Sequence, residues 1–344
     1  MENGTDPTNR VAFAASPSPA MRAEGATPQV AVVIPCYRVG DAIFTVLSRI
    51  GPEVARIYVV DDRCPENTGD RVEAQNTDER VVVLRHTVNQ GVGGALITGY
   101  RRALEDGVTV AVKLDGDGQM DPALIPRFVK PILSGQADYT KGNRFYNLKS
   151  LIGMPRVRLI GNAVLSFMTK ISSGYWRVFD PTNGYTAVHT AALRLLPLDK
   201  IARDYFFESD MLFRLNIVRA VVQDVPMDAF YGDEKSGLKV AKVIPRFLAR
   251  HAANALKRVF YCYFLRDFQL ASINLIVGIL GVFGGAIFGI RHWILSEQSN
   301  VPASAGTVML ATLPIILGVQ LLLQAVSYDI QNQPTRPIHK DFEA

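Results

Sequence analysis

The chain has 344 residues, of which 48% are hydrophobic and 20% are charged, so it can bury one sizeable core and still carry further apolar sequence. Its net charge of +5, from 37 basic and 32 acidic residues, is too small and too dispersed to indicate a nucleic-acid partner. Cys36, Cys64 and Cys262 have neither metal-ligand spacing nor an even number for disulfides, which excludes a cysteine metal site and favours a reducing compartment.

Residues 1–27 are rich in Ala, Pro, Thr, Ser and Gly and have no apolar period. Such a segment cannot bury enough apolar surface to offset the entropy of ordering, so we expect a disordered leader. It also lacks the basic start followed by an apolar run that marks a secretory signal.

The next part of the chain, residues 28–238, is expected to form an α/β domain. Apolar runs typical of strands covered on both faces alternate there with helix-like stretches, which predicts an open, mostly parallel sheet. The strand-like runs lie at 30–34, 57–60, 81–84 and 108–114, and the helix-like stretches lie around 42–50, 70–76 and 94–105.

Polar side chains follow each of these strands. The segments that contain them are Pro35, Cys36 and Tyr37 after the first run, Asp61 and Asp62 after the second, residues 89–91 after the third, and Asp115 and Asp117 after the fourth. In open α/β sheets, ligands gather beyond the carboxyl ends of the strands. The pattern therefore predicts one binding site at one edge of the sheet.

Asp115, Asp117 and Gln119 are candidate metal ligands. Two carboxylates in an Asp-x-Asp spacing can turn toward one point, and hard oxygen ligands suit Mg²⁺ or Mn²⁺. Gly116 and Gly118 give the backbone freedom to wrap round an ion. A plain turn or a calcium loop is the alternative, but the position after a buried strand favours an ion that bridges to substrate phosphates.

The glycine-rich segment 89–94 is not a dinucleotide fingerprint. Gly94 directly follows Gly93, and the next glycine is Gly99, so the required spacing is missing. The segment instead indicates a tight turn with close helix packing. The first strand is not followed by a glycine-rich phosphate loop, which excludes a P-loop.

Two apolar segments, 271–290 and 307–326, contain no charged residue and have about the length that crosses a bilayer. They predict a transmembrane hairpin within 269–328, with buried soluble helices as the alternative, and a tail at 329–344 on the same side as the α/β domain. Glycines in the first span offer close-packing surfaces for a homo-oligomer, namely Gly278, Gly281, Gly284 and Gly285.

The approach to the first span, 239–268, reads as amphipathic juxtamembrane helix. Its basic residues include Lys242, Arg246, Arg250 and Lys257 on one helical face, which predicts a helix lying on an anionic membrane surface. Packing on the α/β domain is the alternative, and both can hold together. Because the connector between the spans is poor in basic residues, the positive-inside rule predicts a multi-pass protein of the inner (cytoplasmic) membrane with its large domain in the cytoplasm.

Several motifs in order resemble the family 2 glycosyltransferases, and most closely the polyprenyl-phosphate branch that includes dolichyl-phosphate mannose and glucose synthases. They are VVIPCY (32–37), VVDD (59–62), NQGVGGAL (89–96), DGDGQMDP (115–122), GNRF (142–145) and DPTNGY (180–185). The likeness covers roughly 29–242, and the basic segment and the hairpin after it match that branch as well.

The resemblance implies a GT-A fold with a nucleotide-sugar site. Pro35, Tyr37 and Asp61 or Asp62 would then hold the base and ribose. Asp115, Asp117 and Gln119 would ligate the divalent ion at the diphosphate, with Asp117 as a catalytic residue, and Lys235 matches a lysine of a loop that closes over the diphosphate. The sequence departs from the family at Arg38, next to the residues predicted to contact the base, where relatives often carry asparagine.

A lipid phosphate acceptor is already an anionic nucleophile, so cationic clamps matter more than a general base. Arg144 lies in the segment that matches the family's acceptor-phosphate motif, and Arg156 and Arg158 follow it, although solvated surface arginines are the alternative. Glu208 and Asp210 lie where relatives carry an acidic pair. We expect Asp210 to orient the acceptor or a clamp arginine, or else to be an acid favoured at a helix N-terminus.

These features predict an inverting, metal-dependent hexosyltransferase that moves a sugar from a UDP- or GDP-sugar to polyprenyl phosphate, for cell-envelope glycan or glycoprotein synthesis. Its partners would be the donor, the lipid acceptor and the bilayer, with no nucleic acid. A glycosyltransferase acting on another lipid or lipid-linked glycan is the alternative, and a noncatalytic nucleotide-binding membrane scaffold is a remote one.

Overall fold

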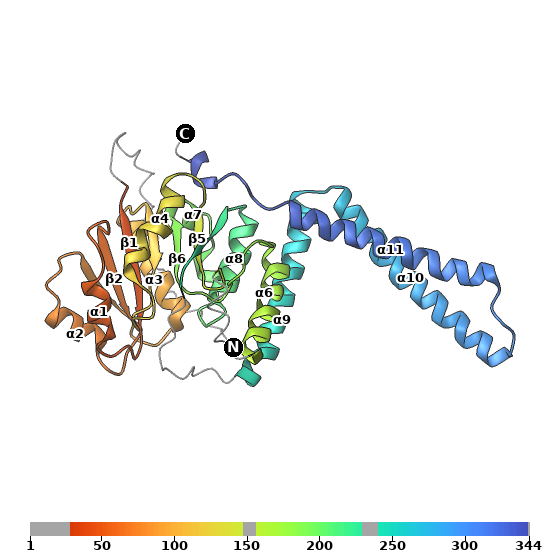
Figure 1. The fold of residues 1–344 in the computed structure, drawn as a ribbon, viewed down its shortest axis with the longest axis horizontal. Coiled ribbons are helices and arrows are strands. Elements are labelled where there is room, and N and C mark those ends of the chain that lie inside the picture. The colour runs from red at the N-terminus through yellow and green to blue at the C-terminus, as the bar shows by residue number, and fades with distance from the viewer. Residues whose placement is uncertain (1–27, 147–155, 229–239, 343–344) are drawn as a thin grey trace, which may run out of the picture.

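The computed structural model describes residues 28–146, 156–228 and 240–342, and only the backbone at 156–159 and 240–244. Within these ranges seven strands form one sheet in the order β3-β2-β1-β4-β6-β5-β7 (Figure 1). They are β1 (Val30–Cys36), β2 (Arg56–Asp61), β3 (Val81–Arg85), β4 (Val110–Lys113), β5 (Tyr139–Asn143), β6 (Thr186–His189) and β7 (Val222–Pro226). Pairs between strands are parallel except that β6 runs antiparallel to β4 and β5. The expected α/β class with a mostly parallel sheet is confirmed.

Helices cover both faces of the sheet (Figure 1). They are α1 (Ala42–Ser48), α2 (Thr68–Gln75), α3 (Gly91–Glu105), α4 (Ile125–Leu133), α7 (Thr190–Arg194) and α8 (Phe207–Ile217). Because successive strand side chains point to opposite faces, Ile34 enters the core under α1 and α4 with Phe128, whereas Val33 enters the core under α3 and α8 with Tyr100. Two apolar cores thus cover the two faces of the sheet.

Helices α6 (Arg156–Ser173) and α9 (Val240–Phe260) pack on each other at the end of the sheet and run across the direction of the hairpin (Figure 1). Ser172 Oγ lies 2.8 Å from His251 Nδ1, and Arg250 pairs with Asp204 at 2.7 Å, so α9 packs on the α/β domain. Their outer surfaces expose large apolar side chains, namely Ile160, Val164, Phe167, Leu248, Leu256 and Phe260. Packing on the domain and an exposed apolar surface therefore occur in the same pair of helices.

The two C-terminal apolar segments are helices, α10 (Leu270–Ser299) and α11 (Ala305–Gln331), and they pack as a hairpin that projects from the domain (Figure 1). In the described part of the chain they are the two helices long and apolar enough to cross a membrane. A Cβ at Gly281 would lie 2.8 Å from the Pro314 carbonyl oxygen, and Gly278 and Gly285 approach α11 as closely. Three of the four glycines expected to serve an oligomer therefore pack inside the hairpin, whereas a Cβ at Gly284 would meet no described atom within 4 Å.

A buried ion-pair cluster joins the hairpin to the domain. Asp329, near the end of α11, lies within 2.6 and 2.9 Å of the two Nη atoms of Arg258 in α9. Tyr263, in the single π-helical turn η3 (Tyr261–Arg266), and Trp176 also donate to the Asp329 carboxylate, at 3.1 and 2.7 Å. We call Trp176, Arg258, Tyr263 and Asp329 the junction cluster.

Beyond α11 the chain returns to the domain. The short helix η4 (Ile338–Asp341) lies at the strand edge opposite the carboxyl edge, where the backbone N–H groups of Ile338 and His339 each donate to Asp138 at 3.0 Å. The His339 ring stacks on that of His189 with centroids 4.4 Å apart. The hairpin is thus joined to α9 by the junction cluster and to the sheet by the segment that follows α11.

Candidate active site at the carboxyl edge of the sheet

The motif residues that sequence analysis singles out meet at one edge of the sheet. The carboxyl ends of β1, β2, β4 and β5 lie there because these strands run parallel, and the amino end of β6 joins them because β6 runs the other way. The DPTNGY turn (180–185) immediately precedes β6, so the antiparallel strand brings it beside the DGDGQ turn that follows β4.

Asp115, Asp117 and Gln119 lie on a compact turn after β4. The Gln119 backbone N–H donates to Asp117 Oδ1 at 3.0 Å, and Gly118 has a left-handed φ of +79°. A Cβ at Gly116 would lie 3.3 Å from both Ile34 and Val39, so glycine lets the turn sit tightly against β1. The Asp115 side chain stays 31% exposed and open to solvent.

The donor set of this turn fits a hard divalent cation. Mg²⁺ and Mn²⁺ accept one or two carboxylates with neutral oxygens and substrate phosphates, which two aspartates and an amide can supply. No cluster of three or more His, Cys, Asp or Glu side chains that could hold a metal occurs among the described residues. An ion at Asp115, Asp117 and Gln119 would therefore depend on the amide and on substrate oxygens to complete its ligands.

A buried lysine lies directly beneath the acidic turn. Lys113 Nζ is 2.8 Å from Glu208 Oε1 and 3.4 Å from Asp115 Oδ1, and its side chain is only 3% exposed. Burial by itself would lower the pKa of Lys113, but Asp115 and Glu208 raise it above its ordinary value, so the lysine stays charged. Burial likewise opposes ionisation of Glu208, yet Lys113 and Lys141 hold the pKa of this carboxyl below its usual value.

Asp61 and Asp62 are placed at the site edge, but their carboxylates are engaged by nearby loops. Asp61 accepts the backbone N–H groups of Cys64 and Gly69, both at 2.7 Å. Asp62 is 2.7 Å from His86 Nδ1 and accepts the backbone N–H groups at 90 and 91. The two aspartates thus hold the loops round the predicted nucleotide pocket through backbone hydrogen bonds. Their direct contact with a base or ribose stays a prediction.

Pro35 lies within β1, and Tyr37 follows it with 44% of its surface exposed. Arg38 has a left-handed φ of 56°, and its guanidinium lies 5.3 Å from the centre of the Tyr37 ring. The residue that departs from the family pattern thus covers the aromatic side chain predicted to contact the nucleotide.

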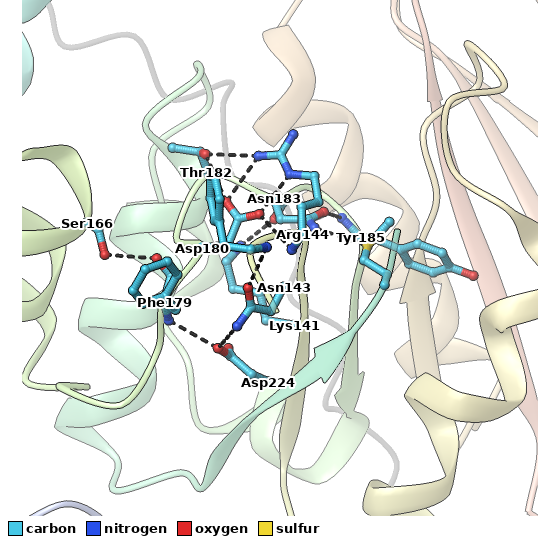
Figure 2. A network of polar contacts seen from close by, with 12 residues as sticks. Lys141, Asn143, Arg144, Ser166, Phe179, Asp180, Thr182, Asn183, Tyr185 and Asp224 are labelled. Atoms are coloured by element: carbon cyan, nitrogen blue, oxygen red, sulfur yellow. Dashed lines mark hydrogen bonds and ion pairs between the residues drawn. The ribbon is translucent and has the colours of Figure 1, made fainter. Parts of the chain in front are cut away.

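Arg144 is held rigidly by the DPTNGY turn, as Figure 2 shows. Its Nε and Nη2 bond the two oxygens of Asp180 at 2.7 and 3.1 Å, and Nη2 also reaches Thr182 Oγ1 at 3.3 Å. Asp180 is fully buried, whereas the Arg144 side chain is 26% exposed. A two-point bond to a buried carboxylate fixes the plane of the guanidinium and leaves part of it toward solvent.

Below this pair a second layer of polar groups supports the same turn (Figure 2). The fully buried Lys141 donates to the Asn183 carbonyl, and its desolvation lowers the pKa to about 8. Asp224 in β7 accepts Asn143 Nδ2 at 3.0 Å and the Phe179 N–H at 3.1 Å, and burial raises its pKa to about 6. The turn that carries Asp180 is therefore built on ionisable groups shielded from water.

Asp210 lies apart from this cluster. Its carboxylate accepts the Ala202 N–H and Arg214 Nε, each at 2.9 Å, and Asn254 Nδ2 of α9 at 3.0 Å. These contacts tie α8 to α9, while Glu208 is the acid of the pair that contacts the site through Lys113. A role for Asp210 in orienting the acceptor stays a prediction.

Three further predicted residues cannot be placed. Lys235 falls outside the described residues, and Arg156 and Arg158 begin α6 in a stretch where only the backbone is described. Sequence reasoning missed Lys113, Lys141 and Asp224. A signal existed for Lys113, because a single lysine interrupts an otherwise apolar strand, and a buried charge is rarely tolerated without a partner.

The interpretation of the glycine-rich segment as close packing is confirmed. A Cβ at Gly91 or Gly93 would lie 2.5 or 2.4 Å from the carbonyl oxygens of Arg203 and Ala202, so the start of α3 touches the loop before α8. A Cβ at Gly99 would collide with Val33 of β1 at 2.2 Å. Glycine at these positions lets α3 lie against both its neighbours.

Several known proteins are similar to this chain in sequence. The family model described as glycosyl transferase family 2 matches residues 31–196. The UDP-N-acetylglucosamine–dolichyl-phosphate N-acetylglucosaminyltransferase of Methanococcus voltae is 30% identical over 214 residues, which is 58% of this chain and 85% of the relative. The undecaprenyl-phosphate mannosyltransferase of Micrococcus luteus is 32% identical over 203 residues, 58% of this chain and 82% of that relative.

A solved structure is similar in fold. Glucosyl-3-phosphoglycerate synthase from Mycobacterium tuberculosis, in complex with Mn²⁺, uridine diphosphate and glucosyl-3-phosphoglycerate, matches with a TM-score of 0.50 at 19% identity. The match covers 67% of this chain and 80% of that chain, and at this identity the likeness establishes the shared GT-A-like fold alone.

Proposed function

Since the chain belongs to glycosyl transferase family 2, we propose that it transfers a hexose from a UDP- or GDP-sugar to polyprenyl phosphate with inversion at the sugar. The product would be a polyprenyl-phosphate sugar for cell-envelope glycan or glycoprotein synthesis. The observation that carries this proposal is the juxtaposition, on one sheet edge, of an open acidic turn at Asp115 and a rigidly held arginine at Arg144.

On the donor side, Asp115, Asp117 and Gln119 would hold Mg²⁺ or Mn²⁺, which when bound offsets the charge of the departing nucleoside diphosphate. Tyr37, with its exposed ring, is placed to bound the nucleotide. Lys235, which lies outside the described residues, would contact the diphosphate. The relative from Methanococcus voltae transfers its sugar from UDP-N-acetylglucosamine, which supports a UDP-sugar as the donor class here.

On the acceptor side, the nucleophile is a phosphate oxygen that is already anionic, so the protein needs to position charge rather than remove a proton. Arg144 suits this task because Asp180 fixes its guanidinium while a quarter of its side chain remains exposed. We expect Arg156 and Arg158, at the start of α6, to add to the clamp. Both named relatives act on polyprenyl-type phosphates, which supports the same acceptor class here.

The membrane location follows from the hairpin and its flanking helices. We propose that α10 and α11 cross the inner membrane and that α6 and α9 lie on its surface through their exposed apolar side chains. The basic residues before α10 favour the cytoplasm for the catalytic domain. A homo-oligomer remains part of the proposal, and among the four glycines only Gly284 offers it an open surface within the described chain.

The test is an assay of the purified full chain with a panel of nucleotide-sugars, Mn²⁺ and undecaprenyl phosphate in lipid vesicles. We expect one donor to give a lipid-linked sugar. Glycosylation of diacylglycerol, ceramide or a lipid-linked oligosaccharide with no product on undecaprenyl phosphate would instead establish the alternative acceptor.

Two variants complete the assay. Asp117→Ala should abolish both turnover and metal-dependent nucleotide binding, whereas Asp199→Asn, on a side chain that is 79% exposed, should change neither. Absence of any product together with retained nucleotide binding in the unaltered chain would support the noncatalytic scaffold.

A further inference from the structure

Lys113 is a charged residue in a place where strands usually carry apolar side chains. It ends β4, which lies between β1 and β6 in the middle of the sheet, and it precedes Asp115 by two residues. Asp115 lies two residues beyond the end of β4, and its carboxylate stays close to the lysine. There the Lys113 ammonium lies between Glu208 Oε1 at 2.8 Å and Asp115 Oδ1 at 3.4 Å.

The same ammonium also supports the acceptor-side turn. A Cβ at Gly184 would lie 2.5 Å from Lys113 Nζ and 3.0 Å from Asp115 Oδ2, so the lysine fills the space directly beneath the DPTNGY turn. That turn carries Asp180, the partner of Arg144. One buried side chain therefore touches both the donor-side turn and the acceptor-side turn.

Charge explains why a lysine at this position matters for a divalent ion. A buried ammonium requires counter-charges, and the Glu208 carboxylate on α8 supplies one of them. Glu208 therefore neutralises the lysine as the nearer partner, and the Asp115 carboxylate remains exposed to solvent on the side away from Lys113. An ammonium this close to a metal ligand holds the carboxylate in place but repels a cation bound there.

We propose that Lys113 is a positioning residue for glycosyl transfer: it holds Asp115 and the DPTNGY turn in register and weakens divalent-cation binding, so that the ion stays exchangeable. This inference rests on the proposed function, because it assumes that Asp115 ligates the ion. A lysine that merely filled the core would influence stability, and metal affinity and turnover would then fall together or not at all.

The experiment compares the full chain with Lys113→Met and with Lys113→Met/Glu208→Gln, which removes both buried charges and keeps the side-chain volumes close. Binding is measured from the electron paramagnetic resonance signal of free Mn²⁺, with UDP and with GDP in separate titrations. Lys130→Met, on an exposed lysine of α4, is the control.

We expect Lys113→Met to bind Mn²⁺ about tenfold more tightly, because a nearby positive charge is gone, while its kcat falls about tenfold because the two turns are no longer held. If the single variant does not fold, the double variant carries the test: its kcat should fall in the same way and its Mn²⁺ affinity should rise by a smaller factor, because the negative charge of Glu208 is lost as well. A folded variant with unchanged Mn²⁺ affinity, or one with unchanged kcat, would overturn this inference and leave the proposed function standing. No Mn²⁺ uptake by the unaltered chain with either nucleotide would overturn the metal step of the proposed function, and this inference with it.

Discussion

The site edge and the membrane junction each hold buried ion pairs, yet they use them differently. In the junction cluster both oxygens of Asp329 accept hydrogen bonds from Arg258, Tyr263 or Trp176. The Asp329 side chain is 12% exposed and that of Arg258 is 5% exposed. At the site edge the Asp115 carboxylate lies 3.4 Å from the Lys113 ammonium, and the Asp115 side chain is 31% exposed. Both oxygens of the Asp329 carboxylate are therefore engaged by protein groups. The Asp115 carboxylate is held by Lys113 on one side and is exposed to solvent on the other.

The difference teaches how to separate structural from functional charges of the same residue types. A carboxylate whose oxygens already accept good hydrogen bonds gains little from a ligand, and breaking its bonds costs stability. A carboxylate held on one side only can bind an ion without losing its support. By this criterion Asp61, Asp62 and Asp210 resemble Asp329, and Asp115 stands apart.

The largest effect is expected where the comparison is sharpest. Under the proposed function, Asp115→Asn removes a carboxylate ligand of the divalent ion that would offset the charge of the leaving diphosphate, so turnover should fall by about 10³-fold. Its melting temperature should barely change, since Lys113 keeps Glu208 as a partner. Activity assays and thermal denaturation in detergent check both halves, with Asp199→Asn as the surface control. A large loss of stability without loss of turnover would place Asp115 with the structural group.

The junction cluster should show the opposite behaviour. Asp329→Ala leaves Arg258 buried without its carboxylate, which should cost about 3–5 kcal/mol of stability. Arg258→Met/Asp329→Leu replaces the pair by apolar groups and should recover most of that loss. Denaturation curves measure the stability, and the kcat of the folded fraction should stay near that of the unaltered chain. A selective fall in kcat at full stability would contradict a purely structural junction.

The contact between α10 and α11 in the hairpin is a structural feature that rests on close packing of glycines and involves no charged groups. Gly281→Ala would place a Cβ 2.8 Å from the Pro314 carbonyl oxygen, so the helices must separate at a cost of about 1–3 kcal/mol. Gly284→Ala, where no described atom lies within 4 Å, is the matched control and should be nearly neutral. Titration with sodium dodecyl sulfate, followed by tryptophan fluorescence, compares the two. Equal losses would indicate that Gly284 also packs against something, such as a second copy of the chain.

Much of the fold could be predicted because its signals are local. The apolar runs at β1 and β2, the uncharged hairpin segments and the DGDGQ turn each carry their pattern within a few residues. Strands β5, β6 and β7 escaped prediction because they are short and carry polar residues among the apolar ones, as in the YTKGN sequence of β5 and the VQDVP sequence of β7. Reversal of β6 depends on long-range pairing, which has no local signature.

The site was predictable to the level of which segments meet, and less so for which atoms are available. The spacing of Asp115 and Asp117 identified the open turn. The VVDD motif, in contrast, does not indicate that the carboxylates of Asp61 and Asp62 accept hydrogen bonds from backbone N–H groups. Those partners come from loops that only the folded chain brings together. Lys113 shows the converse, since its importance was legible as a charge in an apolar strand.

The smallest expected effect concerns Asp224, a site-edge carboxylate that lacks full support. In the described part of the chain its Oδ1 has no hydrogen-bond partner, and burial raises its pKa from 3.8 to about 6. A raised pKa means that the folded state holds the proton more tightly than the unfolded state. The stabilisation is therefore complete below about pH 4 and is lost as the pH rises through about 6.

Asp224→Asn should remove this dependence, because an amide stays neutral and its oxygen can still accept from Asn143 and the Phe179 N–H. Above pH 6 the variant should gain on the order of 1 kcal/mol over the unaltered chain, after allowance for partial exposure to water, and below pH 4 the two should coincide. Denaturation at a series of pH values measures the difference. Parallel curves would mean that Asp224 is charged and satisfied in the folded protein, which would move it to the structural side of the comparison with Asp329.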